Sequence, residues 1–274
     1  MLRIIDAHTH MQMIHTAQQD AVIGRALDAG IGMINAGADE QSSRDAVALS
    51  HKYPQGVWAT VGHHPSEALI HADIAQINAE IKKLAQDEKV VGIGECGLEY
   101  FKLDSAHEEE IKKSQKELFE AHIQLAHEVQ KPLVIHCREA FADTIEILKM
   151  HRGLLLSYAG LPAKALASAG ILHFFTGTID DARELSELGF SFTFGGLITF
   201  NRSFDEIIKF IPVDKILAET DAPWVAPLSH RGQQNEPLYI PEVVEWLAKI
   251  KGVEQKEMEK ILLENTKRVF GLEV

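Results

Sequence analysis

The sequence is poor in cysteine and has no long apolar run. Its 274 residues include two cysteines, Cys96 and Cys137, too few for the disulfide framework of a small secreted domain. No segment approaches the ~18 apolar residues that a membrane-spanning helix needs. The opening MLRIIDAHTH passes from a single basic residue into strand-like sequence without a signal-peptide pattern. We therefore expect a cytoplasmic protein with reduced cysteines and no membrane segment.

Basic residues are also scarce. The chain has 27 lysines and arginines against 40 aspartates and glutamates, which gives a formal net charge of −13. Proteins that bind long stretches of duplex nucleic acid normally carry a basic surface. The charge balance therefore excludes extensive wrapping of DNA.

Short apolar runs alternate with amphipathic stretches along the whole chain. This alternation is typical of repeated βα units around a parallel sheet, and 274 residues is close to the ~250 of an eight-fold barrel. We predict an α/β protein whose residues 1–274 form one single-domain (β/α)8 TIM barrel. The eight predicted strands are Arg3–Ala7, Gly32–Ala36, Val57–Val61, Val90–Gly94, Leu133–His136, Ile171–Phe174, Phe190–Phe194 and Ile216–Glu219.

The longest predicted helix covers Ser105–Gln130. Ser105 and Glu108 are spaced as a capping box, and apolar residues follow at helical intervals. We assign no chemistry to the histidines of predicted helices, among them His122, and expect them at the surface. The connection over residues 137–172 is longer than the others, and its glycines and proline predict a helix, a loop and a second short helix.

Six potential metal ligands stand at or just past the ends of predicted strands. Alternate side chains of a strand share a face, so two imidazoles in His8-x-His10 can aim at one ion. The strands of a barrel open onto one face at their carboxyl ends, whereas an open doubly wound sheet would spread the six apart. Each alone has a structural explanation, but six buried together would be costly without a cation. The six are His8, His10, Glu95, His136, His173 and Asp221.

Seven ordered motifs resemble the TatD family of metal-dependent deoxyribonucleases within the amidohydrolase superfamily. They are DAHTH (6–10), VGHHP (61–65), GECGLEY (94–100), IHCREA (135–140), HFFTG (173–177), ETDAPW (219–224) and NEP (235–237). The resemblance implies a TIM barrel of the metal-dependent hydrolase type with two divalent ions. Imidazole and carboxylate donors suit Zn²⁺, Mn²⁺ or Mg²⁺. The ligands that it implies are His8 and His10 for one ion, His136 and His173 for the other, Glu95 as a bridge and Asp221 beside the first.

The implied chemistry is metal-assisted hydrolysis. A metal-bound hydroxide would attack phosphorus, with Asp221 taking the proton and Glu95 holding the ions. Charge counting leaves the pocket at roughly +1, which attracts a phosphodiester. His64 matches a family position that contacts substrate, and Arg138 follows a strand where it can hold a phosphate through two hydrogen bonds. We predict a deoxyribonuclease that binds DNA ends or short oligonucleotides weakly and needs no obligate protein partner.

Two other interpretations remain open at this stage. The same ions can hydrolyse a carboxylic ester, lactone or amide, including a D-aminoacyl ester on tRNA. A barrel that has lost turnover would be a metal-binding scaffold, although the full ligand set argues against this. Gln12 stands where the family usually has aspartate and predicts altered support around the ions. His122 stands where the family often has glutamine.

Overall fold

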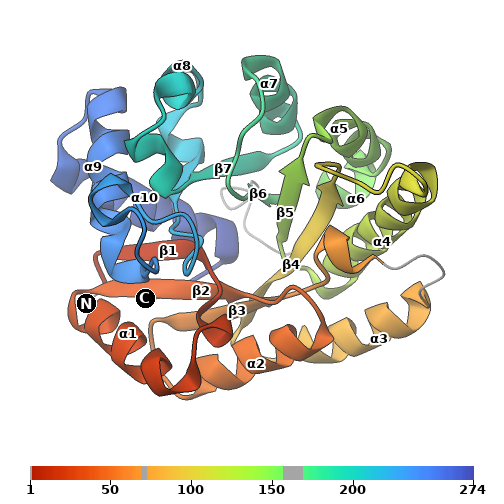
Figure 1. Cartoon of the computed structure of the whole chain (residues 1–274), viewed down its shortest axis with the longest axis horizontal. Coiled ribbons are helices and arrows are strands. Elements are labelled where there is room, and N and C mark those ends of the chain that lie inside the picture. Colours follow the sequence, from red (N-terminus) through yellow and green to blue (C-terminus); the bar gives the residue numbers. More distant parts are fainter. Residues whose placement is uncertain (1, 69–72, 157–168) are drawn as a thin grey trace.

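An eight-stranded parallel sheet, rolled into a near-closed barrel, forms the centre of the molecule (Figure 1). The computed structural model describes residues 2–68, 73–156 and 169–274. Each strand pairs in parallel with the next in the chain, so the predicted fold class is confirmed. The strands are β1 (Ile4–Thr9), β2 (Ile31–Ala36), β3 (Val57–Val61), β4 (Val90–Glu99), β5 (Leu133–Arg138), β6 (Gly170–Leu172), β7 (Phe190–Phe194) and β8 (Ile216–Ala218).

The predicted strands match the observed ones closely, with one exception. Strands β3 and β7 have the predicted bounds, and β1, β2, β5, β6 and β8 differ from prediction by at most two residues at either end. Strand β4 continues past Gly94 to Glu99, because it keeps pairing with β5 from Cys96 opposite Ile135 to Glu99 opposite Arg138. This extension places a second carboxylate beyond Glu95 on the same strand.

Helices cover the outside of the barrel (Figure 1). Helix α4 begins at Glu108, so the predicted capping box of Ser105 is wrong: the Asp104 carboxylate accepts the Ala106 N–H and a ring N–H of His107, which holds this segment in a turn. In the long connection α6 directly follows α5, and residues 157–168 lie outside the described residues. The helices are α1 (Thr16–Asp28), α2 (Glu40–His51), α3 (Ile74–Leu84), α4 (Glu108–Val129), α5 (Phe141–Met150), α6 (Arg152–Leu156), α7 (Ile179–Glu187), α8 (Asp205–Phe210), α9 (Ile240–Lys251) and α10 (Gln255–Phe270).

The first and last strands meet through Asp6. Its buried carboxylate accepts the backbone N–H of Thr220 at 2.9 Å and also the Thr220 hydroxyl. Beyond β8 the backbone N–H of Asp221 donates to the carbonyl of His8 at 3.0 Å. These contacts join β1 to the segment after β8 at the carboxyl end of the barrel, where two of the predicted ligands lie.

The buried apolar side chains of the described residues form two clusters. The larger one fills the layer between strands and helices. The smaller one takes residues mainly from alternate positions of the strands, as expected for a barrel interior, and includes the end of α10. Its buried members are Ile5, Ala7, Ile34, Val91, Val134, Ile171, Leu217, Val269, Phe270 and Leu272. No helix in the described part of the chain combines the length and apolar character needed to cross a membrane.

The two cysteines are free thiols and buried. Cys96 and Cys137 both belong to the larger apolar cluster. Burial raises the pKa of both thiols, that of Cys137 to about 12. Their side chains therefore pack as small apolar groups, as strand alternation predicts for residues that directly follow potential ligands.

His122 is fully buried, so the expectation of a surface histidine at this position is wrong. Its Nδ1–H donates to the Leu118 carbonyl at 2.9 Å, and its Nε2 accepts the backbone N–H of His63 at 3.2 Å. Burial lowers the pKa of His122 to about 4. A neutral imidazole thus connects α4 to the loop after β3.

Candidate metal centre

The carboxyl ends of the strands surround an open hollow of about 350 Å³. His10, Glu95, His136, His173 and Asp221 line it, and His8 lies behind them with its Nε2 3.5 Å from the Glu95 carboxylate. The structure therefore brings all six predicted ligands together. The other side chains that line the hollow are Met13, Ala38, His64, Ser66, Glu67 and Trp224.

Glu95 lies at the centre of this group. Its Oε2 is 3.5 Å from the Nε2 atoms of both His8 and His10. Its Oε1 is 3.1 Å from Nδ1 of His136 and 2.8 Å from Nε2 of His173. Within the two imidazole pairs the facing nitrogens are 3.0 and 3.2 Å apart. One carboxylate therefore presents one oxygen to each of two imidazole pairs, which also touch each other where the rings of His8 and His173 stack at 3.9 Å between centroids.

Asp221 completes the group around the first imidazole pair. Its Oδ1 lies 3.9 Å from Nε2 of His8 and 3.6 Å from Nε2 of His10. Its φ of 55° is in the left-handed region, which non-glycine residues adopt rarely and often at functional sites. The buried amide of Asn235 donates to the carbonyl of Thr220 at 2.8 Å, which fixes the backbone just before Asp221.

Irregular strand pairing positions the ligands. The register of β1 against β2 shifts between Asp6 and Thr9, and that of β4 against β5 shifts between Ile93 and Cys96. Such irregularities re-aim side chains near active sites. Gly62 lets β3 and β4 approach closely, because a Cβ there would lie 2.8 Å from the carbonyl oxygen of Glu95. Regular alternation alone would not give these side-chain directions.

The pKa values of the two imidazole pairs are shifted in opposite directions. Burial lowers the pKa of His8 and lowers that of His10 to about 3, so both rings are neutral and keep the lone pair that a metal ion needs. Burial also acts to lower the pKa of His136 and His173, but the nearby carboxylates, Glu95 above all, outweigh it and raise both values. The same imidazoles overcome the effect of burial on Glu95 and hold its pKa well below the usual value.

The donor set fits divalent cations. A tetrahedral Zn²⁺ with nitrogen ligands at 2.0–2.1 Å keeps them about 3.3 Å apart, and the facing nitrogens here are 3.0 and 3.2 Å apart. One shared proton could hold the two facing nitrogens of a pair together. It could not at the same time bind the Glu95 oxygen that both nitrogens face, whereas a cation could bind all three atoms. Burial raises the pKa of Asp221 well above its usual value, as expected for a carboxyl group that needs a cation beside it.

Comparison with known proteins identifies the family. The family described as "TatD related DNase" matches residues 5–271. The chain belongs to the TatD family. The "Uncharacterized metal-dependent hydrolase YabD" of Bacillus subtilis (strain 168) is 35% identical to it over 98% of this chain and 99% of that protein. The "3'-5' ssDNA/RNA exonuclease TatD" of Erwinia tasmaniensis is 32% identical over 93% of this chain and 94% of that protein.

A solved structure supports the same assignment. The crystal structure of YJJV, a TatD homologue from Escherichia coli K12, covers 99% of both chains with a TM-score of 0.84 and 25% sequence identity. The resemblance read from the seven sequence motifs is therefore confirmed. The protein is a metal-dependent hydrolase of the TatD family, and its buried histidine and glutamate groups are the candidate metal centre.

Arg138 lies beside the TatD site but does not line the hollow. Its guanidinium group stacks over the Phe101 ring at 3.6 Å from the centroid. Its Nη1 is 3.9 Å from the Glu99 carboxylate, and about half of the side chain is exposed. The stacking orients the guanidinium group at the rim, with part of it open to solvent.

Sequence reasoning missed two carboxylates of the TatD site. Oε2 of Glu99 is 3.1 Å from Nε2 of His136, and Oε2 of the fully buried Glu219 is 3.8 Å from Nδ1 of His173. Each stands behind one imidazole of the second pair. The estimate of roughly +1 for the charge of the metal-loaded pocket omitted both carboxylates and is therefore too high. The available signal was spacing, because Glu99 follows Glu95 by four residues on one strand and therefore shares its face.

Gln12 does not reach the imidazole groups. Its Nε2 donates to the carbonyl of Ala36, the last residue of β2, at 2.6 Å. The amide thus ties the turn after His10 to the neighbouring strand from outside the hollow. Altered support around the ions at this position, where the TatD family usually has aspartate, stays a prediction.

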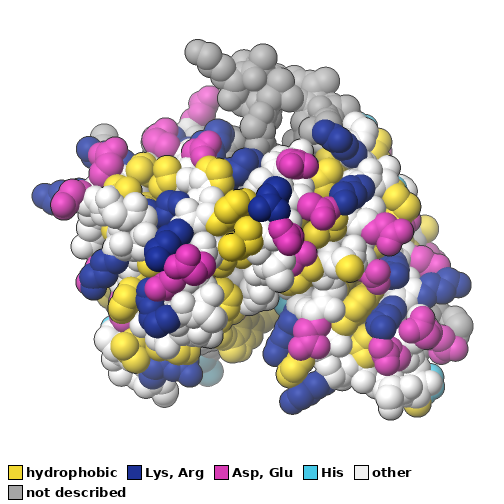
Figure 2. Space-filling model, turned by 90° about the horizontal axis from the view of Figure 1, so that it is seen from above, with side chains coloured by type: hydrophobic (Ala, Val, Ile, Leu, Met, Phe, Trp, Pro, Cys, Tyr) yellow, Lys and Arg dark blue, Asp and Glu magenta, His cyan; other side chains and the backbone are white. Residues whose placement is uncertain are grey.

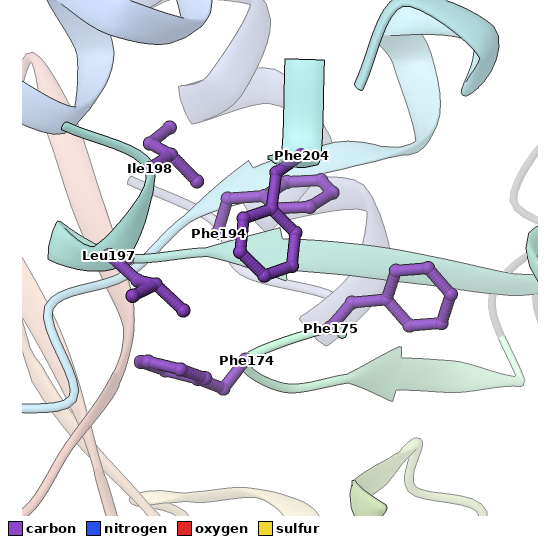
Figure 3. A pocket seen from close by; sticks show the side chains of 7 residues that line it. Phe174, Phe175, Phe194, Leu197, Ile198 and Phe204 are labelled. Atoms are coloured by element: carbon purple, nitrogen blue, oxygen red, sulfur yellow. The ribbon is translucent and has the colours of Figure 1, made fainter. Parts of the chain in front are cut away.

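The flank beside His173 is a packed aromatic wall (Figure 3). The side chains of this wall come from the end of β7 and from the segments after β6 and β7. They leave a cavity of about 10 Å³, which holds at most one water molecule. The open space of the TatD site is therefore the hollow itself. The labelled residues of the wall are Phe174, Phe175, Phe194, Leu197, Ile198 and Phe204.

Proposed function

We propose that this protein is an exonuclease that hydrolyses phosphodiester bonds at one end of a single-stranded nucleic acid, with two divalent cations, Zn²⁺, Mn²⁺ or Mg²⁺. The observation that carries the proposal is the Glu95 carboxylate, which presents one oxygen to each of two imidazole pairs beside an open hollow. The proposed ligands are His8 and His10 for one cation, His136 and His173 for the other, Glu95 between them and Asp221 beside the first.

Asp221 is the proposed proton acceptor. When bound, the cations supply positive charge for the phosphoryl oxygens and make water more acidic. The Asp221 carboxylate faces the hollow near His10, where it can take the proton of the water that attacks phosphorus. The same proton can then pass to the leaving oxygen as the old phosphorus–oxygen bond breaks.

His64 is the proposed hydrogen-bond donor to the phosphate. The backbone N–H of Ser66 donates to His64 Nδ1 at 3.1 Å, so in the neutral ring Nε2 carries the hydrogen. Burial lowers the pKa of His64 to about 4, which keeps the ring neutral. This Nε2 lies 3.6 Å from the Glu95 carboxylate on the wall of the hollow. An Nε2–H in that place favours phosphate binding over a role as a further metal ligand.

Arg138 is the proposed contact to the next phosphate along the strand. A guanidinium group can bind a phosphate through two parallel hydrogen bonds. Stacking on Phe101 at 3.6 Å restricts the group to the rim of the hollow. Only a substrate that extends out of the hollow can reach it, which fits a chain of nucleotides better than a small ester.

The charge distribution favours a short contact with one strand end. On the face seen in Figure 2, lysine and arginine side chains are interspersed with aspartate and glutamate and form no continuous basic surface. The net charge of −13 acts against binding along a long polyanion. The relative from Erwinia tasmaniensis is named as an exonuclease on single-stranded DNA and RNA, which supports the same choice of substrate here.

The proposal is tested with protein that has been stripped by chelator and resupplied with Mg²⁺, Mn²⁺ or Zn²⁺. We expect end-labelled single-stranded DNA and RNA to be shortened one nucleotide at a time from one end. His136→Ala and Asp221→Asn should abolish the shortening. His51→Ala is the matched control, because His51 is exposed at the end of α2 and pairs with Asp87 away from the hollow.

Two outcomes would contradict the exonuclease proposal. Metal-dependent hydrolysis of lactones or aryl esters without any shortening of nucleic acid would indicate a carboxylic ester hydrolase. Metal uptake without turnover of either substrate panel would indicate a metal-binding scaffold.

Replacing Glu99 with alanine is expected to weaken metal binding about ten- to a hundredfold. The carboxylate is held by the Phe101 N–H at 2.8 Å and faces Nε2 of His136 at 3.1 Å, so it fixes the ring that presents Nδ1 to Glu95. Competition with a chromophoric chelator measures the affinity. Glu110→Ala, an exposed change on α4, should leave it unaltered. An affinity for metal within a factor of two of wild type in Glu99→Ala would refute this positioning role.

A further inference from the structure

Two large apolar side chains are exposed at the metal centre. Met13 is 43% exposed and Trp224 is 47% exposed, and both line the hollow. Most of the other lining residues are imidazoles, carboxylates or a hydroxyl group. Apolar surface exposed beside catalytic groups is typical of a place where a ligand binds.

The backbone holds Trp224 firmly in this place. Its N–H donates to the carbonyl of Asp221 at 2.9 Å. The amide of Asn235 donates to the carbonyl of Trp224 at 2.6 Å and to that of Thr220 at 2.8 Å. Asn235 is fully buried, so a buried polar side chain fixes both ends of the segment that presents the indole. The backbone that carries the exposed ring is therefore pre-organised at the hollow.

The indole of Trp224 contacts one of the candidate ligands, His10. Its centroid lies 5.0 Å from that of His10, with the two rings inclined at 65°. A molecule that binds beside His10 and Asp221 therefore lies within reach of the Trp224 ring. An uncharged aromatic face offers no ionic attraction to phosphate, but it stacks well on a planar base.

We propose that Trp224 is the stacking platform for the base of the terminal nucleotide, and that Met13 packs against the same base. This inference rests on the proposed exonuclease function and names the part of the substrate that the hollow holds. The aromatic wall beside His173 cannot serve instead, because its cavity of about 10 Å³ has no room for a base. Because every base has an aromatic face, this platform recognises a nucleotide end with little preference for sequence.

The kinetic test compares two oligonucleotides that differ only at the end the enzyme attacks. One carries a normal terminal thymidine and the other a terminal abasic residue. Wild type should remove the normal residue with a kcat/KM about tenfold higher. Trp224→Ala should reduce that ratio to nearly one, whereas Trp224→Phe should keep most of it. Leu228→Ala, which removes an exposed apolar side chain outside the hollow, should keep the wild-type ratio.

A binding test separates this inference from the exonuclease proposal. Emission from Trp224 is isolated by subtracting the signal of the Trp224→Phe variant, since the chain has three tryptophans. Thymidine 5'-monophosphate should quench this emission in the metal-loaded protein, and deoxyribose 5-phosphate should not. If quenching is found but no strand is shortened, the base site stands and the exonuclease proposal falls. Equal quenching by both probes, absence of quenching, or an unchanged ratio in Trp224→Ala would overturn the platform.

Discussion

Glu95→Gln is expected to lower kcat/KM, assayed with added divalent metal, by roughly a thousandfold, a loss of about 4 kcal/mol in transition-state stabilisation. Glutamine has nearly the same shape as glutamate but only one oxygen. The NH2 group that replaces the other oxygen cannot accept from an imidazole or bind a cation. One of the two imidazole pairs that face Glu95 would therefore lose its carboxylate partner.

The same substitution should change the metal content. A neutral amide also removes the negative charge that offsets two neighbouring cations, so we expect at least one of them to be lost. Elemental analysis after dialysis measures the number of ions per chain. Glu67→Gln is the control, because Glu67 lines the same hollow without an ion pair to these imidazoles. Full metal content together with activity within tenfold of wild type in Glu95→Gln would refute the central role of this carboxylate.

The fold and the approximate place of the site follow from local sequence patterns. Each strand forms a short apolar run, and a parallel barrel brings all carboxyl ends of its strands to one face. Residues as distant as His8 and Asp221 therefore had to converge once eight strands were recognised. The motifs that resemble the TatD family gave the order of these ligands, but not the distances among them.

The contacts behind the ligands depend on details that such patterns do not contain. Glu99 reaches His136 because β4 continues beyond Glu95 after an irregularity in its pairing with β5. Glu219 follows β8 and reaches the neighbourhood of His173, which follows β6, across the end of the intervening strand β7. Both carboxylates stand within quoted motifs, four residues after Glu95 and two before Asp221. The spacing of these carboxylates from the candidate ligands could therefore have been used to predict them. The extra length of β4, which brings Glu99 to His136, could not be predicted from the sequence pattern.

His122 shows the limit of helical patterns. Periodicity places His122 on one side of an amphipathic helix. Whether that side is buried depends on what packs against it, which the periodicity does not show. Here the partner is the backbone N–H of His63 in the loop after β3, 59 residues away in sequence. A buried imidazole with one donor and one acceptor satisfied fits this place as well as an amide would. The difference between the two groups is that only the imidazole titrates.

His122→Gln is expected to make the protein less sensitive to acid. Burial lowers the pKa of His122 from 6.5 to about 4 in the folded chain. Between these two pH values His122 is protonated in the unfolded chain but not in the folded chain. The contribution of the neutral imidazole to the free energy of unfolding is therefore fully present above pH 6.5 and falls as the pH drops towards 4. The lost free energy of unfolding is about 3 kcal/mol, at 1.36 kcal/mol per pKa unit. Glutamine at this position removes that contribution.

The measurement is urea unfolding of metal-free wild type and His122→Gln at several pH values between 7 and 4, with the pH range set by the lowered pKa of His122. Since the remaining histidines titrate equally in both proteins, the difference between the two curves isolates His122. Gln124→His, which adds an imidazole at an exposed position of α4, should run parallel to wild type. If the curves of wild type and His122→Gln also run parallel, the buried imidazole is not what makes the folded chain sensitive to acid. A divergence below pH 6.5 would instead tie acid stability to the contact between α4 and the loop that presents His64.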